Sequence, residues 1–326
     1  MKNLLFYLVT MILLFFLAEY AFRFYTKFET IYDIEMHKYA LKLKQVSHTD
    51  GLSHEHIPNT EAQLMNVNVA INNIGLRDDF IDNLKNKNEY RIIYLGSSIT
   101  MGWGVPFDSV FTSLLEEKLN TNNNNIYYNI INAGIGNYNT EMESIYLDMN
   151  IASLQPDQVF LHYFINDAEI LNQNENHYLV KTSYLVAYFY IRLKHLLINS
   201  SSNYNSIGQY YLDLYTEKNT GWENAKKSIT RINDICKSND IGFSVVIQPD
   251  LQNLSKDSDE FKCHSIIKNF LRFNNIEFID LFDDFSLKIK NDPKVYWVAP
   301  GDRHPNSKGH KLIFDSLYEN LSLLYK

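Results

Sequence analysis

The chain has 326 residues, of which 45% are hydrophobic and 21% are charged. This composition is typical of globular proteins, which excludes fibrous, collagen-like and wholly disordered chains, and the length suits one or two domains. The formal net charge of −8 is not offset by a basic patch. It therefore argues against nucleic acid as the main partner and against a general attraction to anionic lipid.

The N-terminus carries an apolar run over residues 4–18 (LLFYLVTMILLFFLA). A membrane-spanning helix needs about 20 apolar residues, and residues 20–22 extend the run past Glu19. Lys2 supplies the basic start of a secretory signal, but residues 18–21 lack a small-x-small cleavage site. We expect residues 1–27 to hold an uncleaved signal-anchor, which makes this a single-pass membrane protein. A cleaved signal and a buried core helix are the alternatives.

The charges that flank this run do not decide its orientation. We expect the body outside the cytoplasm because no other segment resembles a membrane span. Residues 28–88 are polar without a strong period, and we interpret them as a stalk and N-terminal extension. Within them, residues 31–43 have helical spacing and residues 72–77 resemble a turn that leads to an edge element.

From residue 89 onward, short apolar runs alternate with helical patterns. The five predicted strands are residues 91–95, 126–131, 158–164, 243–247 and 276–281, and the predicted helices are residues 107–119, 140–150, 222–236, 260–273 and 307–324. Gly221 is expected to break the chain before the third helix. Strands that alternate with helices predict an α/β fold with a parallel sheet covered on both faces, here over residues 89–326.

Residues 171–220 interrupt this alternation with a segment rich in Tyr and Leu. Its apolar run, residues 183–191, ends at Arg192, Lys194 and His195, so it is too short and too charged to span a bilayer. Two interpretations stay open. One is a helical insertion that packs on the core, and the other is a lid or a surface that rests on the membrane near the site. Cys236 and Cys263 are too few for a disulfide framework or a four-thiolate zinc site, and a bridge between them stays open.

Four short polar segments are candidates for the chemistry, because ligands of an open parallel sheet bind at the carboxyl ends of its strands. The first three follow predicted strands and the fourth precedes the last helix: GSSIT (residues 96–100), NAGIGNYNT (132–140), FIND (164–167) and DRHPNSKGH (302–310). Each segment alone also fits a helix cap or an ordinary turn. The first is not a phosphate loop, because the lysine and spacing of that motif are absent.

The residue types in these segments suit acyl transfer by a serine. A serine at a strand end can attack an ester, and His304 can act as its general base. Asp302 can orient the imidazole and stabilise its charged form. Asn166 can donate its side-chain amide to an oxyanion. His310 lies in or near the last helix, where a structural role is expected.

Together the four segments, in this order, resemble the four blocks of the SGNH (GDSL-type) hydrolase family over residues 72–326. The resemblance implies a flavodoxin-like three-layer α/β/α sandwich and acyl-ester chemistry without a metal or cofactor. Carried over by position, Ser98 is the nucleophile, His304 the base and Asp302 the orienting acid. The resemblance also implies an oxyanion hole made by the Asn166 amide and the backbone N–H groups of Ser98 and Asn137.

The sequence departs from the family pattern at three positions. Ser97 replaces the aspartate of the first block. Asn137 falls where the family has its oxyanion glycine, and an asparagine tolerates left-handed backbone angles better than most residues. The acid lies two residues before His304, whereas many members place it three before, at the position of Gly301. The shorter spacing resembles the membrane-anchored branch that acts in envelope polysaccharide O-acetylation.

The function expected from the resemblance is a serine-dependent esterase that removes acyl groups, such as acetyl, from a cell-envelope glycan or lipid. An O-acyltransferase of envelope polysaccharide would use the same triad and differ only in its acceptor. A membrane-anchored glycan-binding protein without catalysis is a further alternative, which the presence of Ser98, Asn166, Asp302 and His304 disfavours. The oligomeric state does not follow from the sequence.

Overall fold

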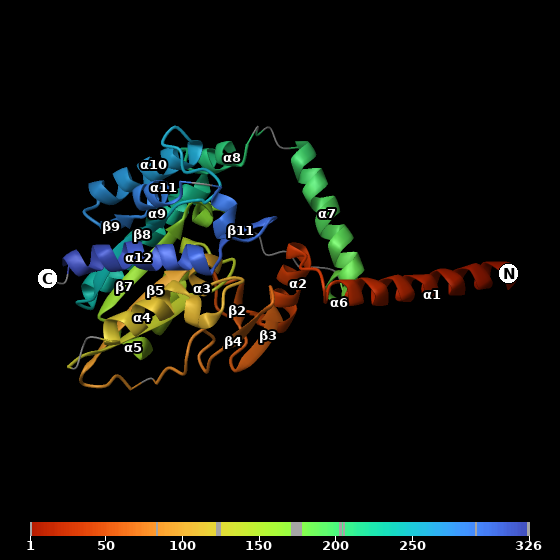
Figure 1. Ribbon diagram of the computed structural model, residues 1–326, viewed down its shortest axis with the longest axis horizontal. Helices are drawn as coiled ribbons and strands as arrows, with labels where there is room; N and C mark the ends of the chain where they lie inside the picture. The colour runs from red at the N-terminus through yellow and green to blue at the C-terminus, as the bar shows by residue number, and fades with distance from the viewer. Residues whose placement is uncertain are drawn as a thin grey trace.

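The computed structural model describes residues 2–82, 84–121, 125–170, 178–201, 204, 206–290 and 292–324 (Figure 1). Its centre is a five-stranded sheet in the order β6-β5-β7-β8-β9, and every neighbouring pair is parallel. The strands are β5 (Glu89–Gly96), β6 (Tyr127–Gly134), β7 (Gln158–Phe164), β8 (Gly242–Gln248) and β9 (Glu277–Asp280). In chain order this is the 2-1-3-4-5 arrangement of flavodoxin-like folds, whose switch point lies between β5 and β7.

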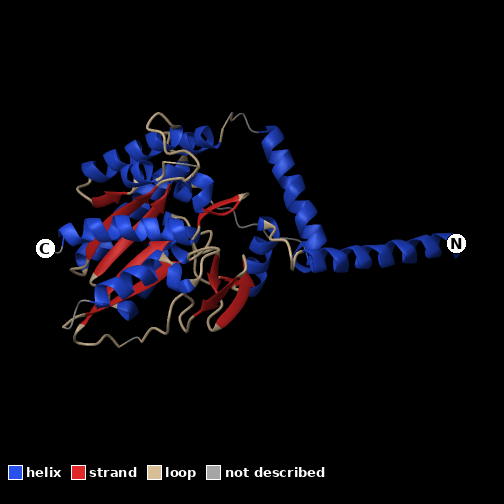
Figure 2. Cartoon of the chain, viewed as in Figure 1, coloured by secondary structure: helices blue, strands red, loops and turns tan. Residues whose placement is uncertain are grey.

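Helices cover both faces of this sheet and make three layers (Figure 2). One face carries α5 (Thr140–Leu154), α9 (Thr220–Ser238) and α10 (Asp259–Phe273), and the other carries α4 (Phe111–Thr121), α11 (Phe282–Lys288) and α12 (Ser307–Leu324). Side chains alternate along a strand, so Ile93 and Leu95 of β5 enter one core while Ile92 and Tyr94 enter the other. The expected three-layer α/β/α class is confirmed.

Residues 28–88 are more regular than their sequence indicated. They form α2 (Tyr32–Lys42) and two antiparallel hairpins, β1 (Lys44–Val46) with β2 (His54–His56) and β3 (Thr60–Leu64) with β4 (Val67–Ile71). The expected helix is present as α2, but the turn at residues 72–77 follows a hairpin strand instead of leading to one. The hairpin strands have only three to five residues, so the sequence shows no clear alternation of apolar and polar side chains there.

This extension packs on the sheet domain instead of projecting from it. Tyr39 and Leu43 of α2, together with Leu64 and Val69 of the second hairpin, form a third apolar core. Trp103, from the loop after β5, completes that core. Residues 32–71 therefore belong to the folded body, and the division of the chain at residues 27 and 88 stays a prediction.

Helix α1 (Lys2–Tyr25) extends away from the body, toward the N-terminal end of Figure 1. In the part of the chain that the structure describes, it is the one helix long and apolar enough to cross a membrane, by length and composition only. The described part of the 171–220 segment forms α6 (Tyr178–Thr182), α7 (Tyr184–Ser201) and α8 (Ile207–Leu214). Helix α8 packs on α10, whereas α6 and α7 contact each other and α7 also contacts α1 and α2.

Gly221 does not break the chain, because it lies in the first turn of α9. A Cβ at this position would lie 2.0 Å from the carbonyl oxygen of Ala168. The glycine therefore permits a close approach of α9 to the loop after β7. Cys236 and Cys263 are both buried and free.

Candidate active site

The loop after β5 places Ser98 at the start of the short helix α3 (Ser98–Met101). Two glycines permit its tight packing. A Cβ at Gly96 would lie 2.0 Å from Thr100 Oγ1, and one at Gly134 of β6 would lie 2.2 Å from the backbone nitrogen of Met101. Helix α3 therefore sits directly against the carboxyl ends of β5 and β6, at the edge where a flavodoxin-like sheet binds ligands.

Ser98, His304 and Asp302 form one hydrogen-bonded line. Oγ of Ser98 lies 2.7 Å from Nε2 of His304, and Nδ1 of the same ring lies 2.5 Å from Oδ1 of Asp302. An ionised carboxylate only accepts hydrogen bonds, so the proton of the neutral ring belongs on Nδ1 and Nε2 is left to accept from the serine hydroxyl. The histidine and aspartate come from strand β11 (Asp302–Pro305), which pairs with β10 (Trp297–Ala299) in a hairpin that was not predicted.

The environment of Asp302 keeps its carboxylate ionised. Burial raises its pKa, but the hydrogen bonds and charge of His304 and the hydrogen bond from the Trp103 indole outweigh that effect. The net result is a pKa below the ordinary value for aspartate. Trp103 Nε1 donates to Oδ2 of Asp302 at 2.8 Å, so both carboxylate oxygens have partners.

Arg77 holds the end of the loop that carries Ser98. Its buried guanidinium donates to the carbonyl oxygens of Met101, Gly102 and Val105. These carbonyls lie at the end of α3 and just beyond it, where backbone acceptors have no partner within the helix. The turn at residues 72–77 was expected only to lead to an edge element. It also places the positively charged side chain of Arg77 against the carbonyl end of α3.

A cavity of about 250 Å³ opens at Ser98. Side chains from several elements far apart in the sequence line it, among them Tyr32, Ser98, Asn166, Tyr211, Asp250, Asp302, Arg303 and His304. Asn166 lies in the short 3-10 helix Ile165–Ala168 that follows β7. Strands β5 and β7 are neighbours, so Ser98 and Asn166 reach this cavity from the two sides of the switch point.

Asn137 is not among the residues that line this cavity. Its backbone has the left-handed φ of 70° that its position in the second block suggested. Its side chain is exposed and accepts a hydrogen bond from Lys44, while the N–H of Gly136 donates to the hydroxyl of Tyr39. The assignment of Asn137 to the oxyanion hole therefore stays a prediction, and the structure does not bring it to the wall that Ser98 and Asn166 share.

Several residues at the cavity were missed from the sequence. Asp250 follows β8, so the carboxyl-end rule that selected the other loops would have selected it as well. Arg303 donates to Asp250 Oδ2 at 3.2 Å and to Gln252 Oε1, which makes a polar wall beside His304. Tyr32 stacks on His304 with ring centroids 6.3 Å apart. No sequence signal linked Tyr32, in the N-terminal extension, to a site 272 residues away.

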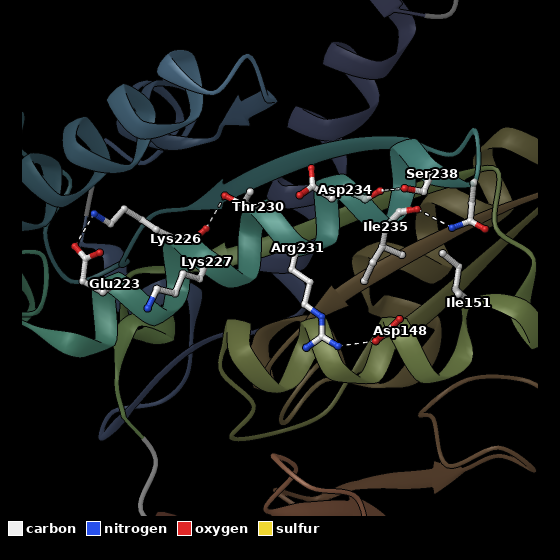
Figure 3. A pocket seen from close by; sticks show the side chains of 11 residues that line it. Asp148, Ile151, Glu223, Lys226, Lys227, Thr230, Arg231, Asp234, Ile235 and Ser238 are labelled. Atoms are coloured by element: carbon white, nitrogen blue, oxygen red, sulfur yellow. Dashed lines mark hydrogen bonds and ion pairs between the residues drawn. The ribbon is translucent and has the colours of Figure 1, made fainter.

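A second groove lies between α5 and α9, two helices that cover the same face of the sheet (Figure 3). Charged side chains dominate its wall, and two ion pairs, Arg231 with Asp148 and Lys226 with Glu223, join neighbouring residues there. These are exposed pairs on a solvated helix face. The groove contains none of the sequence-predicted site residues.

The sheet order defines the class of fold, a flavodoxin-like three-layer α/β/α sandwich with a cavity lined by the polar loops at its carboxyl edge. The chain belongs to the GDSL-like lipase/acylhydrolase family, whose model matches residues 94–312. The family resemblance inferred from the four segments is thereby confirmed.

Among solved structures, the acetyl xylan esterase AlAXEase is similar at 19% identity and a TM-score of 0.46, over 71% of this chain and 98% of that one. A catalytic mutant of Axe2, an acetylxylan esterase from Geobacillus stearothermophilus, matches at 12% identity and a TM-score of 0.47, over 73% and 95% of the two chains. A two-domain esterase active on acetylated mannans matches at 15% and 0.43, over 72% of this chain and 49% of that one. The sequence matches none of the curated proteins with which it was compared.

Proposed function

We propose that the protein is a membrane-anchored serine esterase that removes acyl groups from a cell-envelope glycan or lipid. The observation that carries this proposal is the line from Ser98 Oγ through His304 to Asp302, with separations of 2.7 and 2.5 Å. A nucleophile, a base and an orienting carboxylate in hydrogen-bond contact are what acyl transfer by a serine requires.

In the proposed mechanism, His304 removes the proton of Ser98 as the hydroxyl oxygen attacks the ester carbonyl. The carbonyl oxygen then carries a negative charge, which the Asn166 amide and the backbone N–H of Ser98 stabilise, and Asn137 is the predicted further donor. Collapse of this intermediate breaks the bond to the alcohol, which leaves with the proton from His304. In the second half, His304 removes a proton from water as the water oxygen attacks the carbonyl of the acyl-serine. The bond to Ser98 Oγ then breaks, and the serine leaves with the proton from His304. Asp302 stabilises the charged imidazole in both halves.

The polar side chains beside the triad favour a substrate whose alcohol part carries many hydroxyl groups, as a glycan does. Asp250, which is 4% exposed, and Arg303, which donates to it, offer both an acceptor and a donor at the cavity. Carboxylate and guanidinium groups can each make two hydrogen bonds to neighbouring hydroxyls. An O-acyltransferase would use the same residues and differ in accepting a sugar hydroxyl in place of water.

Anchoring by α1 and a body outside the cytoplasm complete the proposal. Residues 3–25 are long and apolar enough to cross a bilayer, and few of their side chains are buried. A cleaved signal sequence would pass the same test, so the mass of the mature chain distinguishes the two.

Covalent labelling with a fluorophosphonate, followed by peptide mass spectrometry of the full-length protein in detergent, tests the mechanism. We expect the label on Ser98, and we expect it to disappear in His304→Ala. Ser97→Ala is the matched control, because Ser97 is the adjacent, buried serine and should leave labelling unchanged. A label on Ser97, or no label on folded protein, would contradict the assignment.

A further inference from the structure

Helix α7 is joined to the membrane helix by a buried carboxylate. Glu19 of α1 is 8% exposed and accepts hydrogen bonds from Ser183 Oγ at 2.7 Å and from the backbone N–H groups of Tyr184 and Leu185 at 2.9 Å each. It therefore caps the start of α7, where backbone donors lack helical partners. Arg23, one turn further along α1, pairs with Glu19 at 2.6 Å and donates to the carbonyl of Thr182.

The position of this junction along α1 places it near one boundary of a bilayer. The apolar run over residues 4–18 spans about 23 Å at the helical rise, whereas the hydrocarbon of a bilayer is about 30 Å thick. Residues 20–22 lengthen the apolar stretch beyond Glu19, and Arg23 is the first basic residue after Lys2, so the junction with α7 lies near the end of the stretch that α1 can bury in hydrocarbon. Helix α7 then crosses the direction of α1 instead of continuing it (Figure 1).

One face of α7 is apolar and points back along α1. Its side chains recur every three or four positions, which puts them on one helix face. Together with Phe15, which lies one turn before Glu19, they line an apolar groove of about 330 Å³: Leu185, Val186, Phe189, Tyr190 and Leu193. Phe189 is 62% exposed and Leu193 57% exposed, so this face has no cover within the described chain.

The other face of α7 holds the extension that reaches the candidate active site. Ala187 is fully buried, and Arg192 pairs with Asp33 of α2 at 3.2 Å. Tyr184 packs edge-on against His37 of α2. Helix α2 begins at Tyr32, whose ring stacks on His304. The chain of contacts thus runs from the membrane helix through α7 and α2 to the cavity.

We propose that α7 is an interfacial helix whose apolar face, Leu185, Val186, Phe189, Tyr190 and Leu193, lies in the bilayer that α1 crosses. The inference rests on the proposed role of α1 as an anchor. A bilayer fits this face better than a protein partner because the groove is continuous with the exposed apolar surface of α1. The basic residues Arg192 and Lys194 at its flank suit a headgroup region, as in other interfacial helices. It follows that the esterase works on acyl groups presented at the membrane surface.

Nitroxide accessibility in the full-length protein tests this placement. Phe189→Cys and Leu193→Cys are each spin-labelled and reconstituted in vesicles of phosphatidylcholine and phosphatidylglycerol. The matched control is Phe273→Cys at the end of α10, because Phe273 is 86% exposed and lies away from α7. Native Cys236 and Cys263 are fully buried, so the labelled wild-type chain reports any background.

We expect collisions with oxygen to exceed collisions with a water-soluble nickel complex at 189 and 193, and the ratio to reverse at 273. Free access of nickel to 189 and 193 overturns the proposal, and so does shielding from both reagents, which marks a protein partner on this face. Glu19→Ala, which removes the cap, should raise the mobility of the label at 193, whereas Glu29→Ala should not.

Fluorophosphonate labelling of Ser98 in the same vesicles separates the two proposals. A labelled serine with nickel-accessible α7 sites leaves the esterase proposal standing and removes the interfacial helix. An unlabelled serine together with oxygen-accessible sites at 189 and 193 leaves the interfacial helix standing and contradicts the esterase proposal.

Discussion

The indole N–H of Trp103 donates to Oδ2 of Asp302 at 2.8 Å, while the other carboxylate oxygen faces Nδ1 of His304. Trp103 is 1% exposed and packs with Tyr39 in the core that the N-terminal extension forms. The extension thus supports the carboxylate that orients the histidine. In the proposed mechanism Trp103 is a positioning residue, since it would act through Asp302 and is not among the residues that line the cavity.

Trp103→Phe should lower kcat about tenfold and leave KM nearly unchanged, because a hydrogen bond to a charged group contributes about 1.5–3 kcal/mol. The indole helps to keep the pKa of Asp302 low. Its loss raises that pKa, so as pH falls the carboxylate is protonated earlier, and the acid limb of kcat/KM moves to higher pH. The pH profile on p-nitrophenyl acetate measures this shift. Trp222→Phe, a buried tryptophan of α9, is the control, and an unshifted limb would contradict the role.

Asn166→Ala should reduce kcat by about 10²–10³, the usual cost of removing one oxyanion donor. Substrate binding should change less, because the charge on the oxygen develops only in the transition state. Turnover of p-nitrophenyl acetate by purified protein measures the split between kcat and KM. Asn150→Ala, at the far side of α5, controls for loss of an asparagine. Wild-type turnover in Asn166→Ala would remove this residue from the oxyanion hole.

Arg77→Met should destabilise the protein by at least about 2 kcal/mol, since buried carbonyl groups left without a donor cost about 1–3 kcal/mol each. The variant removes the guanidinium that donates hydrogen bonds to the carbonyls of Met101, Gly102 and Val105. Urea unfolding monitored by circular dichroism gives the difference. Arg272→Met, an exposed arginine of α10, should stay near wild type. Equal unfolding midpoints for both variants would show that α3 does not depend on Arg77.

Glu143→Gln should stabilise the protein increasingly as pH rises above 5. Burial raises the pKa of the Glu143 carboxyl well above its ordinary value, and the nearby Asp167 carboxyl raises it further. Both oxygens of Glu143 are buried without a hydrogen-bond partner. The folded chain therefore holds a proton that the unfolded chain releases above its own pKa, so wild-type stability falls with rising pH, by at most about 1.4 kcal/mol per pH unit for one proton.

Urea midpoints of wild type and Glu143→Gln at pH 5 and pH 8 test this linkage. The gap between the two proteins should widen at pH 8. Glu141→Gln, two residues earlier on an exposed position of the same helix, should show no such widening. A gap that is constant with pH would mean that Glu143 is not held protonated.

The sheet domain could be predicted from the sequence because its strands are continuous apolar runs, and buried parallel strands have that signature. Strand β7 and helix α12 have the predicted bounds. The hairpins of the extension were not predicted, because strands of three to five residues contain too few alternations of apolar and polar side chains to establish a period.

The candidate site was partly predictable for a similar reason. Ser98, Asn166 and His304 lie where strands end or where the last helix begins, and the topology brings such loops together. Tyr32 and Trp103 reach the site through packing of the N-terminal extension, which no local pattern connects to it, whereas Arg303 lies in the fourth segment but meets Asp250 only through the fold. Asn137 has the left-handed backbone that its position suggested, Lys44 and Tyr39 of the extension contact its loop, and its place in the oxyanion hole stays a prediction.

The hydrogen bond between Ser98 and His304 joins residues 206 positions apart. During synthesis, helix α1, the serine and strands β5 to β7 all emerge long before the β10–β11 hairpin that supplies His304 and Asp302. Contacts of such separation form late, after most of the chain is available. In a nascent chain, the Ser98 hydroxyl therefore lacks its hydrogen-bond partner His304 until the β10–β11 hairpin, near the end of the chain, has been made.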